Sequence, residues 1–180
     1  DHPKFNDFDL SSIKFVLLAT GPDWYDRCQK VFPKLEIIAH HYGFTEGTGV
    51  SVPPDEKDYK VRKFTNGRPW PGVEVKVVDP DTGQKVPPNQ RGELCLRGWS
   101  RFQEYYKDPE ETNKAIDSEG FFHSGDYGWM DEDGNVVYRG RYKMMIKSGG
   151  ENVSEREVEV LLEEMPGIRS VQVIGVPDKK

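Results

Sequence analysis

The stretch with the greatest chemical content is residues 42–49, which read YGFTEGTG and place a hydroxyl beside a carboxylate, at Thr45 and Glu46. Its three glycines, Gly43 among them, would let backbone N–H groups approach a phosphate closely, and the threonine hydroxyl can add a donor. A single carboxylate suits Mg²⁺, which commonly takes one or two carboxylates plus phosphate oxygens, and Tyr42 offers a flat ring for a base. On these residues alone, a glycine-rich connection with an exposed acid is favoured over a phosphate-binding loop.

Two later residues have the chemistry to bind a ribose. Asp126 lies at a strand end within FHSGD, where a carboxylate can accept hydrogen bonds from ribose hydroxyls, as in dinucleotide-binding folds. Arg141, in YRGRYK, follows the next strand and could bind the same ribose or a phosphate. Taken singly, an Asx turn leading into Gly128 and a surface arginine explain the two residues at least as well.

Lys143 and Lys147 lie four residues apart around an apolar group at 144–146, a pattern typical of a solvated edge. The sequence Ser-Gly-Gly at 148–150 follows and precedes a capped helix. So flexible a joint suits a domain hinge.

Three other patterns do not predict a site. DEDGN at 131–135 lacks the twelve-residue spacing of a calcium loop and is interpreted as a hairpin turn. His40 and His41 have no histidine or cysteine partner at ligand spacing, so no zinc site is predicted there. The glycosylation sequon at 152–154 is set aside because Ser154 is better placed as a helix cap.

The elements that must position these residues begin with a strand, a helix and a second strand. Residues 13–19 are a nearly continuous apolar run, as in a strand buried on both faces. A helix is predicted to start at Pro22 and Asp23 and to stop at Pro33, and a second strand covers residues 35–39. This order predicts a right-handed crossover between parallel strands.

The same order predicts where a ligand would bind. In open parallel sheets, ligands bind outside the carboxyl ends of the strands. The segment 20–22, which contains Gly21, leaves the first strand there, and the loop YGFTEGTG leaves the second. We therefore expect the two loops to be neighbours on one rim of the sheet.

The middle of the chain has the pattern of an antiparallel sheet with hairpins. Residues 73–78 and 91–98 alternate, with a turn at 79–83 between them. A short helix capped by Asp108 interrupts the sheet. Two further strands joined by an Asp-Gly turn follow in residues 121–141.

The C-terminal part changes again. Ser154 and Glu157 form a capping box ahead of an amphipathic helix. The apolar face of that helix consists of Val158, Leu161, Leu162 and Met165. Pro166 and Gly167 end it, and residues 170–176 alternate as a strand.

Composition limits the classes of protein to consider. The 180 residues suit one domain or a small two-part unit, and 18 Gly and 13 Pro favour many short elements. A net charge of −6 argues against general binding to nucleic acid or anionic membranes, which requires a basic face. The sequence shows no signal peptide and no apolar run long enough to span a bilayer, and both ends look cut.

The two cysteines, Cys28 and Cys95, are far apart and lie in no metal-ligand spacing. Cys28 falls on an apolar helical face and is expected in the core. Nothing indicates a disulfide framework, so a reducing, cytoplasmic compartment is expected.

Each of these signals is weak singly, but their order is specific. The chain carries, in sequence, Thr-Gly-Pro at 20–22, YGFTE, GRPWPGVEVKVVD, RGELCLRG, FHSGD and GRYKMMIKSGGENVSEREVE. This series resembles the adenylate-forming superfamily, which contains acyl-CoA synthetases, luciferases and the adenylation domains of peptide synthetases. The resemblance runs from about residue 12 to the last residue. Phe44, FHSGD and KSGGEN look more like acyl-CoA synthetases acting on fatty or related organic acids than like peptide-synthetase domains.

The resemblance implies a two-step reaction that uses ATP, Mg²⁺ and coenzyme A. A carboxylate, here expected to be that of a fatty acid, attacks the α-phosphate of Mg·ATP and gives an acyl-adenylate and pyrophosphate. The thiol of CoA then takes the acyl group, and a small C-terminal domain swings about a hinge between the steps. Residues 47–49 would border the acyl pocket.

The resemblance also implies a nucleotide site. Tyr42 and Gly43 would line the adenine pocket together with the loop at Gly21. Thr45 would contact the phosphate, and Glu46 would hold Mg²⁺.

Further roles follow in the second half of the chain. Asp126 and Arg141 would bind the ribose, and Lys143 matches the hinge position. Lys147 would approach the nucleotide or the carboxylate in the thioester-forming conformer. The pantetheine path of CoA would pass two glycines, Gly149 and Gly150.

The chain departs from the superfamily at two points. Relatives carry a phosphate-binding loop rich in Ser, Thr and Gly upstream of the first strand, and a lysine near the C-terminus that neutralises charge as the adenylate forms. Neither has a counterpart here, and Lys179 and Lys180 have no matching context. Such charge stabilisation usually contributes most of the rate enhancement in this kind of catalysis. The intact protein is therefore expected to be an acid-thiol ligase, and these 180 residues alone to be inactive.

The expected fold is mixed α/β, in three parts joined by a hinge. Residues 1–52 form part of a large parallel-sheet lobe, 53–140 an antiparallel, barrel-like subdomain, 141–143 the hinge, and 144–180 the start of a small mobile α+β domain. Some faces that other parts of the protein would normally cover would be exposed to solvent, so marginal stability or self-association of the 180-residue chain in isolation is expected.

Three alternatives remain open. A fatty-acyl-AMP ligase without CoA transfer and a luciferase-like oxygenase belong to the same superfamily and would differ in CoA dependence. A naturally short, non-catalytic nucleotide-binding module would keep Asp126 and Arg141 and need no phosphate loop. No nucleic-acid partner is expected.

Overall fold

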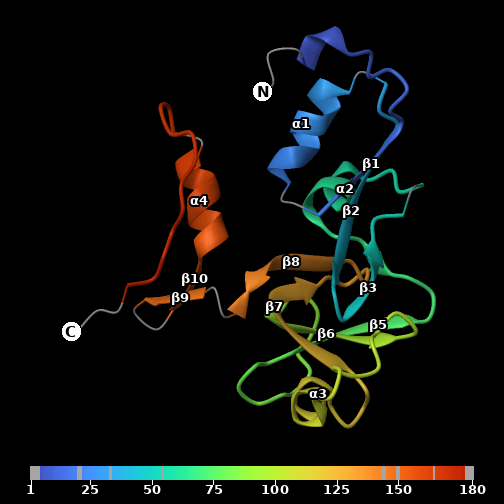
Figure 1. The fold of residues 1–180 in the computed structure, drawn as a ribbon, viewed down its shortest axis with the longest axis vertical. Coiled ribbons are helices and arrows are strands. Elements are labelled where there is room, and N and C mark those ends of the chain that lie inside the picture. Colours follow the sequence, from blue (N-terminus) through green and yellow to red (C-terminus); the bar gives the residue numbers. More distant parts are fainter. Residues whose placement is uncertain are drawn as a thin grey trace.

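The computed structural model describes residues 5–19, 22–32, 34–53, 55–142, 145–148, 151–163 and 165–176. Within these ranges the fold is mixed α/β, as predicted, with short helices beside two four-stranded sheets and one two-stranded sheet (Figure 1).

The first sheet begins with a strand, a helix and a strand. A short 3-10 helix (Phe5–Asp7) precedes β1 (Phe15–Leu18), α1 (Asp23–Val31) and β2 (Ile37–Phe44). β1 and β2 pair in parallel through the whole length of β1. The predicted parallel connection is therefore confirmed.

The amphipathic face of α1 packs on this pair of strands. Tyr25 and Cys28 of α1 form a buried cluster with Leu18 of β1 and Ile38 of β2. Cys28 is thus a core residue, as its position on the apolar helical face predicted.

β1 is not buried on both faces, contrary to the expectation from its apolar sequence. Phe15 and Leu17 are 50% and 53% exposed, whereas Leu18 packs under α1. β1 is the edge strand of its sheet. An apolar run cannot show whether the second face of a strand is covered, because the cover comes from other parts of the tertiary structure.

The stretch YGFTEGTG is also different from the prediction, because it is a β-hairpin and not a loop. β2 continues through Phe44, Thr45 and Glu46 form the turn, and β3 (Gly47–Ser51) returns antiparallel to β2. Two residues suffice to connect antiparallel strands. All three glycines of the stretch therefore lie in strands, where the absence of a side chain permits close packing.

Gly43 illustrates this role. A Cβ at this position would lie 2.5 Å from the Thr48 hydroxyl and 3.0 Å from Nε2 of His41. Thr48 and His41 themselves form a 2.8 Å hydrogen bond. The register shifts between Tyr42 and Gly43, so the missing side chain allows the two strands to cross closely at this bulge.

α2 (Tyr59–Phe64) follows β3, and β4 (Arg68–Pro69) then completes the first sheet. Asp58 caps α2, since its Oδ1 accepts a hydrogen bond from Lys60 N at 2.7 Å. Between these elements Gly67 forms an antiparallel bridge with Val136. This bridge connects the first sheet to the second four-stranded sheet.

The antiparallel sheet predicted for the middle of the chain is confirmed. It consists of β5 (Val73–Val78), β6 (Gly92–Gly98), β7 (Phe122–Met130) and β8 (Val136–Arg141), paired in chain order. β5 and β8 are its edges, so the described strands form an open sheet rather than a closed barrel.

Two predicted local signals are confirmed around this sheet. α3 (Pro109–Ala115) is capped by Asp108, whose Oδ1 accepts from Glu111 N at 3.0 Å. The DEDGN stretch joins β7 to β8, with Asp131 Oδ1 accepting from Asn135 N at 2.7 Å. Asp131 therefore stabilises the turn from within, as the hairpin interpretation predicted.

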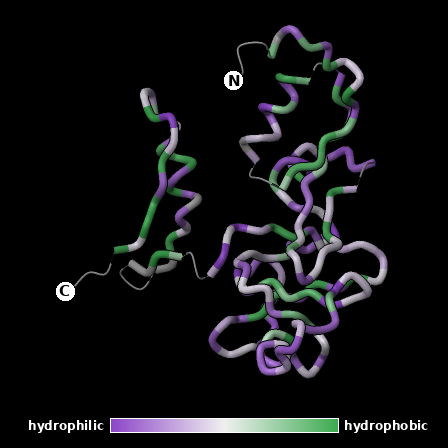
Figure 2. The backbone as a smooth tube through the Cα atoms, viewed as in Figure 1, coloured by the Kyte–Doolittle hydropathy of each residue, from purple (hydrophilic) through white to green (hydrophobic). Residues whose placement is uncertain are grey.

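The main core lies between the two four-stranded sheets. Its buried side chains come from both sheets and from the loop between β5 and β6: Tyr42, Val50, Val77, Val86, Leu94 and Val136. In Figure 2, hydrophobic stretches follow the strands of this central region, and many of the surrounding loops are hydrophilic. Packing of this core brings β2 against β7 and β8.

The C-terminal elements lie to one side of the rest (Figure 1). β9 (Met145–Ser148) and β10 (Glu151–Ser154) form an antiparallel pair, and α4 (Glu155–Glu163) follows directly. The Ser154 hydroxyl accepts a hydrogen bond from Glu157 N at 3.4 Å, which is the forward half of the predicted capping box.

Residues 170–176 do not form the predicted strand. Val173 N donates to Glu159 Oε1 at 3.1 Å, and no strand in the described part of the chain pairs with this segment. Alternation alone cannot make a strand, because the backbone needs a neighbour to pair with.

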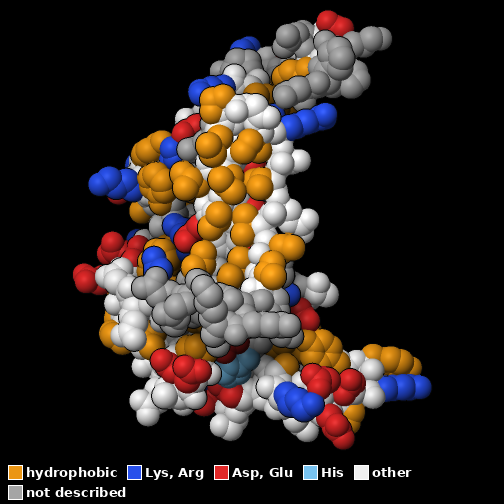
Figure 3. Space-filling view, turned by 90° about the vertical axis from the view of Figure 1, so that its left-hand side faces the viewer, with side chains coloured by type: hydrophobic (Ala, Val, Ile, Leu, Met, Phe, Trp, Pro, Cys, Tyr) orange, Lys and Arg blue, Asp and Glu red, His pale blue; other side chains and the backbone are white. Residues whose placement is uncertain are grey.

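Hydrophobic side chains gather over the upper half of the face shown in Figure 3, the side on which α4 lies in Figure 1. The exposed hydrophobic residues of this C-terminal part are Leu161, Met165, Ile168, Ile174 and Val176.

Across the described ranges, no helix has both the length and the apolar composition needed to cross a membrane.

Candidate functional site

An irregularity in β7 sets the position of Asp126. The pairing of β6 with β7 is interrupted between Glu93 and Cys95, where residues 124–126 of β7 oppose a single residue of β6. Gly125, at the centre of this bulge, has a φ of 69°, which glycine adopts without steric cost. The bulge turns Asp126 inward, where it is only 3% exposed.

Asp126 connects β2 to the end of β8. The Tyr42 hydroxyl donates to Asp126 Oδ2 at 2.9 Å, and Arg141 Nε donates to Oδ1 at 3.1 Å. Ser124 Oγ lies 3.3 Å from the Tyr42 hydroxyl and accepts from Asp126 N at 3.0 Å. The Arg141 side chain is 54% exposed, so this chain of contacts runs from the core to the surface.

Burial is the largest cause of the pKa shifts of Asp126 and Tyr42. It raises the pKa of Asp126 above its ordinary value, although the hydrogen bonds from Tyr42 and Arg141 act in the opposite direction. Burial and the neighbouring Asp126 charge raise the pKa of Tyr42 well above its usual range. Tyr42 therefore stays a neutral donor, and the carboxylate is held ready to accept.

The hairpin turn between β2 and β3 holds Glu46 against the loop that precedes α3. Tyr105 OH donates to Glu46 Oε1 at 2.8 Å, and Phe102 N donates to the Glu46 backbone oxygen at 2.7 Å. Burial and the bond to Glu46 raise the pKa of Tyr105 to about 12. Thr45 is exposed at the same turn.

Glu46 and Arg141 line one cavity of about 660 Å³. This volume lies in the range of small-molecule and cofactor sites. The other residues on its wall come from β2, β6, β7, α3 and the loop before α3: Phe44, Glu93, Tyr105, Tyr106, Asp108, Glu111, Lys114, Ala115, Phe122, His123, Ser124 and Gly125.

Tyr42 is placed differently from a residue on the cavity wall. It is buried, and its ring stacks on Tyr138 with centroids 5.5 Å apart. Gly43 is exposed beside it. The structure thus brings Tyr42, Asp126 and Arg141 into one hydrogen-bonded chain.

The remaining sequence predictions fall on parts that the structure does not describe. Gly21, Lys143, Gly149 and Gly150 lie outside the described residues, and Lys147 lies in β9 with its side chain outside them. Their roles stay predictions.

Sequence reasoning missed four residues that the geometry places at the site. Ser124 and Tyr105 bond to Tyr42 and Glu46 respectively, and Glu93 and His123 line the cavity. Ser124 and His123 belong to FHSGD, whose three polar side chains were a usable signal. Tyr105 had no sequence signal, because it meets Glu46 across 59 residues.

A second cavity, of about 410 Å³, lies on the first sheet and is mostly apolar. Its lining includes the exposed residues of β1 together with His41, Thr48 and Trp70. Thr48, which was predicted to border an acyl pocket, lies on the wall of this second cavity.

Comparison with known proteins adds the family. The sequence profile described as AMP-binding enzyme matches residues 1–106. YngI of Bacillus subtilis, which carries the name of an acyl-CoA synthetase, is 40% identical over 182 residues, or 99% of this chain and 33% of its own length. A 4-coumarate–CoA ligase-like protein of Oryza sativa subsp. japonica is 38% identical over 186 residues, again 99% of this chain and 33% of the relative.

A solved structure agrees with these matches. The o-succinylbenzoate coenzyme A synthetase of Bacillus subtilis, determined in complex with AMP, superposes with a TM-score of 0.79 at 26% identity, covering 93% of this chain and 34% of the other. The chain spans about a third of the length of the curated relatives it matches. It belongs to the family of AMP-binding enzymes, the adenylate-forming superfamily that its motifs resemble.

Proposed function

We propose that the protein containing this chain is an acid-thiol ligase of the acyl-CoA synthetase type. It joins a carboxylic acid to the α-phosphate of ATP, releasing pyrophosphate, and passes the acyl group to the thiol of CoA, releasing AMP. The observation that carries the proposal is that Glu46 and Arg141, the latter paired with Asp126, converge on one cavity of suitable size.

In this proposal Asp126 and Arg141 bind the ribose. The carboxylate accepts hydrogen bonds from the ribose hydroxyls, and the half-exposed Arg141 brings the pair to the cavity. Tyr42 holds the carboxylate from behind at 2.9 Å. Gly43, exposed beside the buried Tyr42, then forms the adenine side of the site together with Gly21, and Thr45 contacts the phosphate.

Glu46 fits the role of a magnesium ligand. It is a single carboxylate at the cavity wall, oriented by Tyr105 through Oε1, which suits an ion that takes its other ligands from phosphate oxygens and water. When bound, Mg²⁺ would offset the negative charge of the polyphosphate. The contribution of the protein is to hold the carboxylate at a fixed place.

The C-terminal elements are assigned to a mobile domain. The hinge would lie at 141–143, at the end of β8, with Lys143 as the hinge residue. The position of β9, β10 and α4 to one side of the other sheets supports this division (Figure 1). Lys147 would approach the nucleotide, and Gly149 and Gly150 the pantetheine of CoA, when the domain turns.

The acid is proposed to be a fatty or related organic acid. The apolar lining of the cavity on the first sheet supports an apolar acyl group. A hydroxycinnamate is the second candidate, because relatives of 34% and 38% identity carry the names of 4-coumarate–CoA ligases or ligase-like proteins.

The test is carboxylate-dependent exchange between ATP and pyrophosphate, followed by acyl-CoA formation on addition of CoA. The full-length protein, the 180-residue chain and an Asp126→Ala variant of the full-length protein are assayed with fatty acids of graded length and with 4-coumarate. Exchange by the full-length protein but not by the other two is expected.

Each other outcome identifies an alternative. Exchange without acyl-CoA formation would indicate an acyl-AMP ligase, and light or oxygen consumption a luciferase-like enzyme. No exchange with any acid, while adenosine or AMP still binds, would reject the ligase and leave a nucleotide-binding module.

A further inference from the structure

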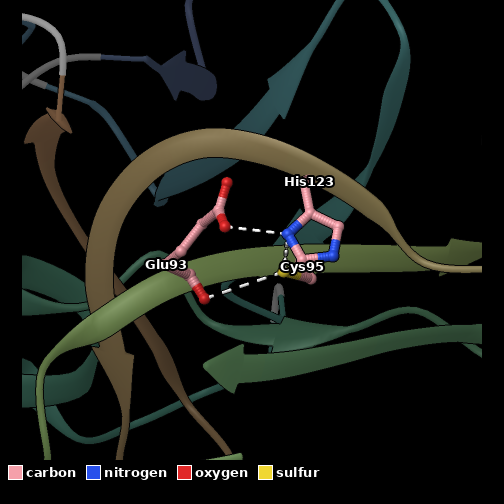
Figure 4. A group of neighbouring side chains, drawn as sticks. All are labelled: Glu93, Cys95 and His123. Atoms are coloured by element: carbon pink, nitrogen blue, oxygen red, sulfur yellow. Dashed lines mark hydrogen bonds and ion pairs between the residues drawn. The ribbon is translucent and has the colours of Figure 1, made fainter. Parts of the chain in front are cut away.

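Three side chains with the chemistry of a metal site meet on one face of the antiparallel sheet. Glu93 and Cys95 are two residues apart on β6 and therefore point to the same side. His123 on β7 pairs directly with Cys95. Figure 4 shows the carboxylate, the thiol and the imidazole directed toward one another.

Their spacing is close to what a small divalent ion requires. The three ligand atoms lie within 4.8 Å of one another. His123 Nδ1 is 3.5 Å from Cys95 Sγ and 2.8 Å from Glu93 Oε2. Tetrahedral zinc, with bonds of about 2.3 Å to sulfur and about 2.0 Å to nitrogen, separates those two atoms by about 3.5 Å. The shorter nitrogen–oxygen distance would have to widen by about half an ångström.

The surroundings orient two of the three groups as a ligand shell would. Gly125 N donates to Glu93 Oε1 at 2.8 Å, which directs Oε2 toward the imidazole. On the other side of the ring, His123 Nε2 lies 3.5 Å from Asp117 Oδ2. A carboxylate behind the second nitrogen of a metal-binding histidine is a common arrangement, since it fixes the ring and its tautomer. Asp117 is itself held by Lys76 at 2.7 Å.

Cys95 is the residue that a simple polar cluster does not explain. It is completely buried and packs in a cluster with Val78 and Phe121, and its sulfur has polar contacts of 3.5 Å to His123 Nδ1 and 3.9 Å to the Glu93 backbone oxygen. Burial raises the pKa of this thiol. A hydrophobic residue would fill the same space, whereas a thiol adds an atom that binds soft divalent ions strongly.

We propose that Glu93, Cys95 and His123 form a site for one zinc-type divalent ion. Binding would release the thiol proton and place the imidazole proton on Nε2, toward Asp117, so that a carboxylate, a thiolate and a neutral imidazole balance the two charges of the ion. Three protein ligands leave one position for water. Glu93 and His123 line the cavity shared with Glu46 and Arg141, so that position faces the cavity. The proposal does not depend on the ligase activity.

The probe is Co²⁺, which reports a thiolate ligand by a charge-transfer band in the near ultraviolet. Full-length protein is treated with EDTA, separated from it, and titrated with Co²⁺ in the absence of nucleotide. We expect one equivalent to produce the band and Zn²⁺ to abolish it. Cys95→Ser should remove the band, and Asp117→Asn should weaken binding by about 10- to 100-fold.

Two controls separate this site from others. Cys28→Ser, in the distant α1 cluster, and Glu46→Gln, at the proposed magnesium site, should leave the band unchanged. Glu93→Gln and His123→Gln provide a second test should Cys95→Ser not fold, and each should weaken Co²⁺ binding at least tenfold. Absence of the band in the unsubstituted protein, or its persistence in folded Cys95→Ser, Glu93→Gln and His123→Gln proteins, would overturn the proposal.

Discussion

At the scale of single residues, the site depends on how a buried carboxylate is satisfied. Asp126 is almost fully buried, and its two oxygens accept from Tyr42 and Arg141. A buried charge is tolerated only when it is paired and hydrogen-bonded. Tyr42 therefore stabilises the fold as well as the geometry that a ribose would meet.

Tyr42→Phe should destabilise the protein by about 1–3 kcal/mol, because it leaves a buried carboxylate oxygen without its donor. Urea unfolding of the full-length protein measures the effect. Tyr106→Phe is the control, since Tyr106 is 85% exposed and its loss should change stability little. Equal stability of the two variants would contradict the role assigned to the Tyr42 hydroxyl.

The raised pKa of Asp126 predicts a pH dependence of nucleoside binding. As the pH falls, the buried carboxylate protonates earlier than an ordinary aspartate, whose pKa is 3.8, and the protonated group accepts hydrogen bonds poorly. Affinity for adenosine should therefore fall with the pH, with a midpoint above 3.8. The contribution of Asp126 to the stability of the fold should change in the opposite direction and increase as the pH falls, because the folded state holds this proton more tightly than the unfolded state.

Calorimetric titration with adenosine, which has no phosphate to titrate, measures this profile. In Asp126→Asn the affinity should be about 10- to 100-fold lower, because hydrogen bonds to a charged acceptor are lost, and this pH step should disappear. An unchanged profile in Asp126→Asn would assign the titration to another group.

At the scale of elements, bulges and tight crossings bring the site residues together. Alternation, apolar runs and turn residues predicted most of the strands. The cap at Asp108 and the Asp-Gly turn were predicted correctly because their hydrogen bonds are local. The bulge at residues 124–126 was not predicted, because it is defined only by pairing with β6.

Gly67 joins the two four-stranded sheets, and a matched pair of glycines tests this. Gly67 and Gly83 have similar positive φ values, 82° and 70°. A Cβ at Gly67 would lie 2.1 Å from the Ser51 backbone, whereas one at Gly83 meets nothing within 4 Å. Gly83→Ala should cost about 1–2 kcal/mol from backbone strain alone, and Gly67→Ala about 3 kcal/mol or more.

Thermal unfolding of both variants in the full-length protein measures the difference. Equal losses would mean that the contact of Gly67 with Ser51 and its bridge to Val136 contribute little to the junction.

At the scale of the whole molecule, the described residues include two exposed apolar surfaces. One is the face of β1 that carries Phe15 and Leu17, and the other lies on the C-terminal part around Leu161 and Ile174. Contiguous exposed hydrophobic surface promotes association. The chain also spans only about a third of the length of its curated relatives.

The 180-residue chain by itself should therefore self-associate through the β1 face. Replacing Phe15 and Leu17 together by Ser should weaken association at least about tenfold, because two large apolar side chains no longer become buried. Sedimentation velocity over a concentration series measures this. Trp99→Ser is the control, since Trp99 is 66% exposed and lies elsewhere, and an equal effect from it would reject the β1 face as the contact.

The sequence by itself determined most of the element types, the parallel start, the antiparallel middle and the ordered motifs that identify the family. These features depend on side-chain periodicity, on local capping and on residue order, all of which are written along the chain. It also named Tyr42, Glu46, Asp126 and Arg141, because their place in the ordered motifs decided between uses that the residue types alone left open.

Only the tertiary structure decided which partners these residues have. Tyr42 meets Asp126 across 84 residues, Glu46 meets Tyr105 across 59, and Cys95 meets His123 across 28. The burial of β1 and the pairing of residues 170–176 also failed as predictions for this reason. A side chain carries its own chemistry, but its burial and its neighbours are set by segments distant in sequence, which no local pattern records.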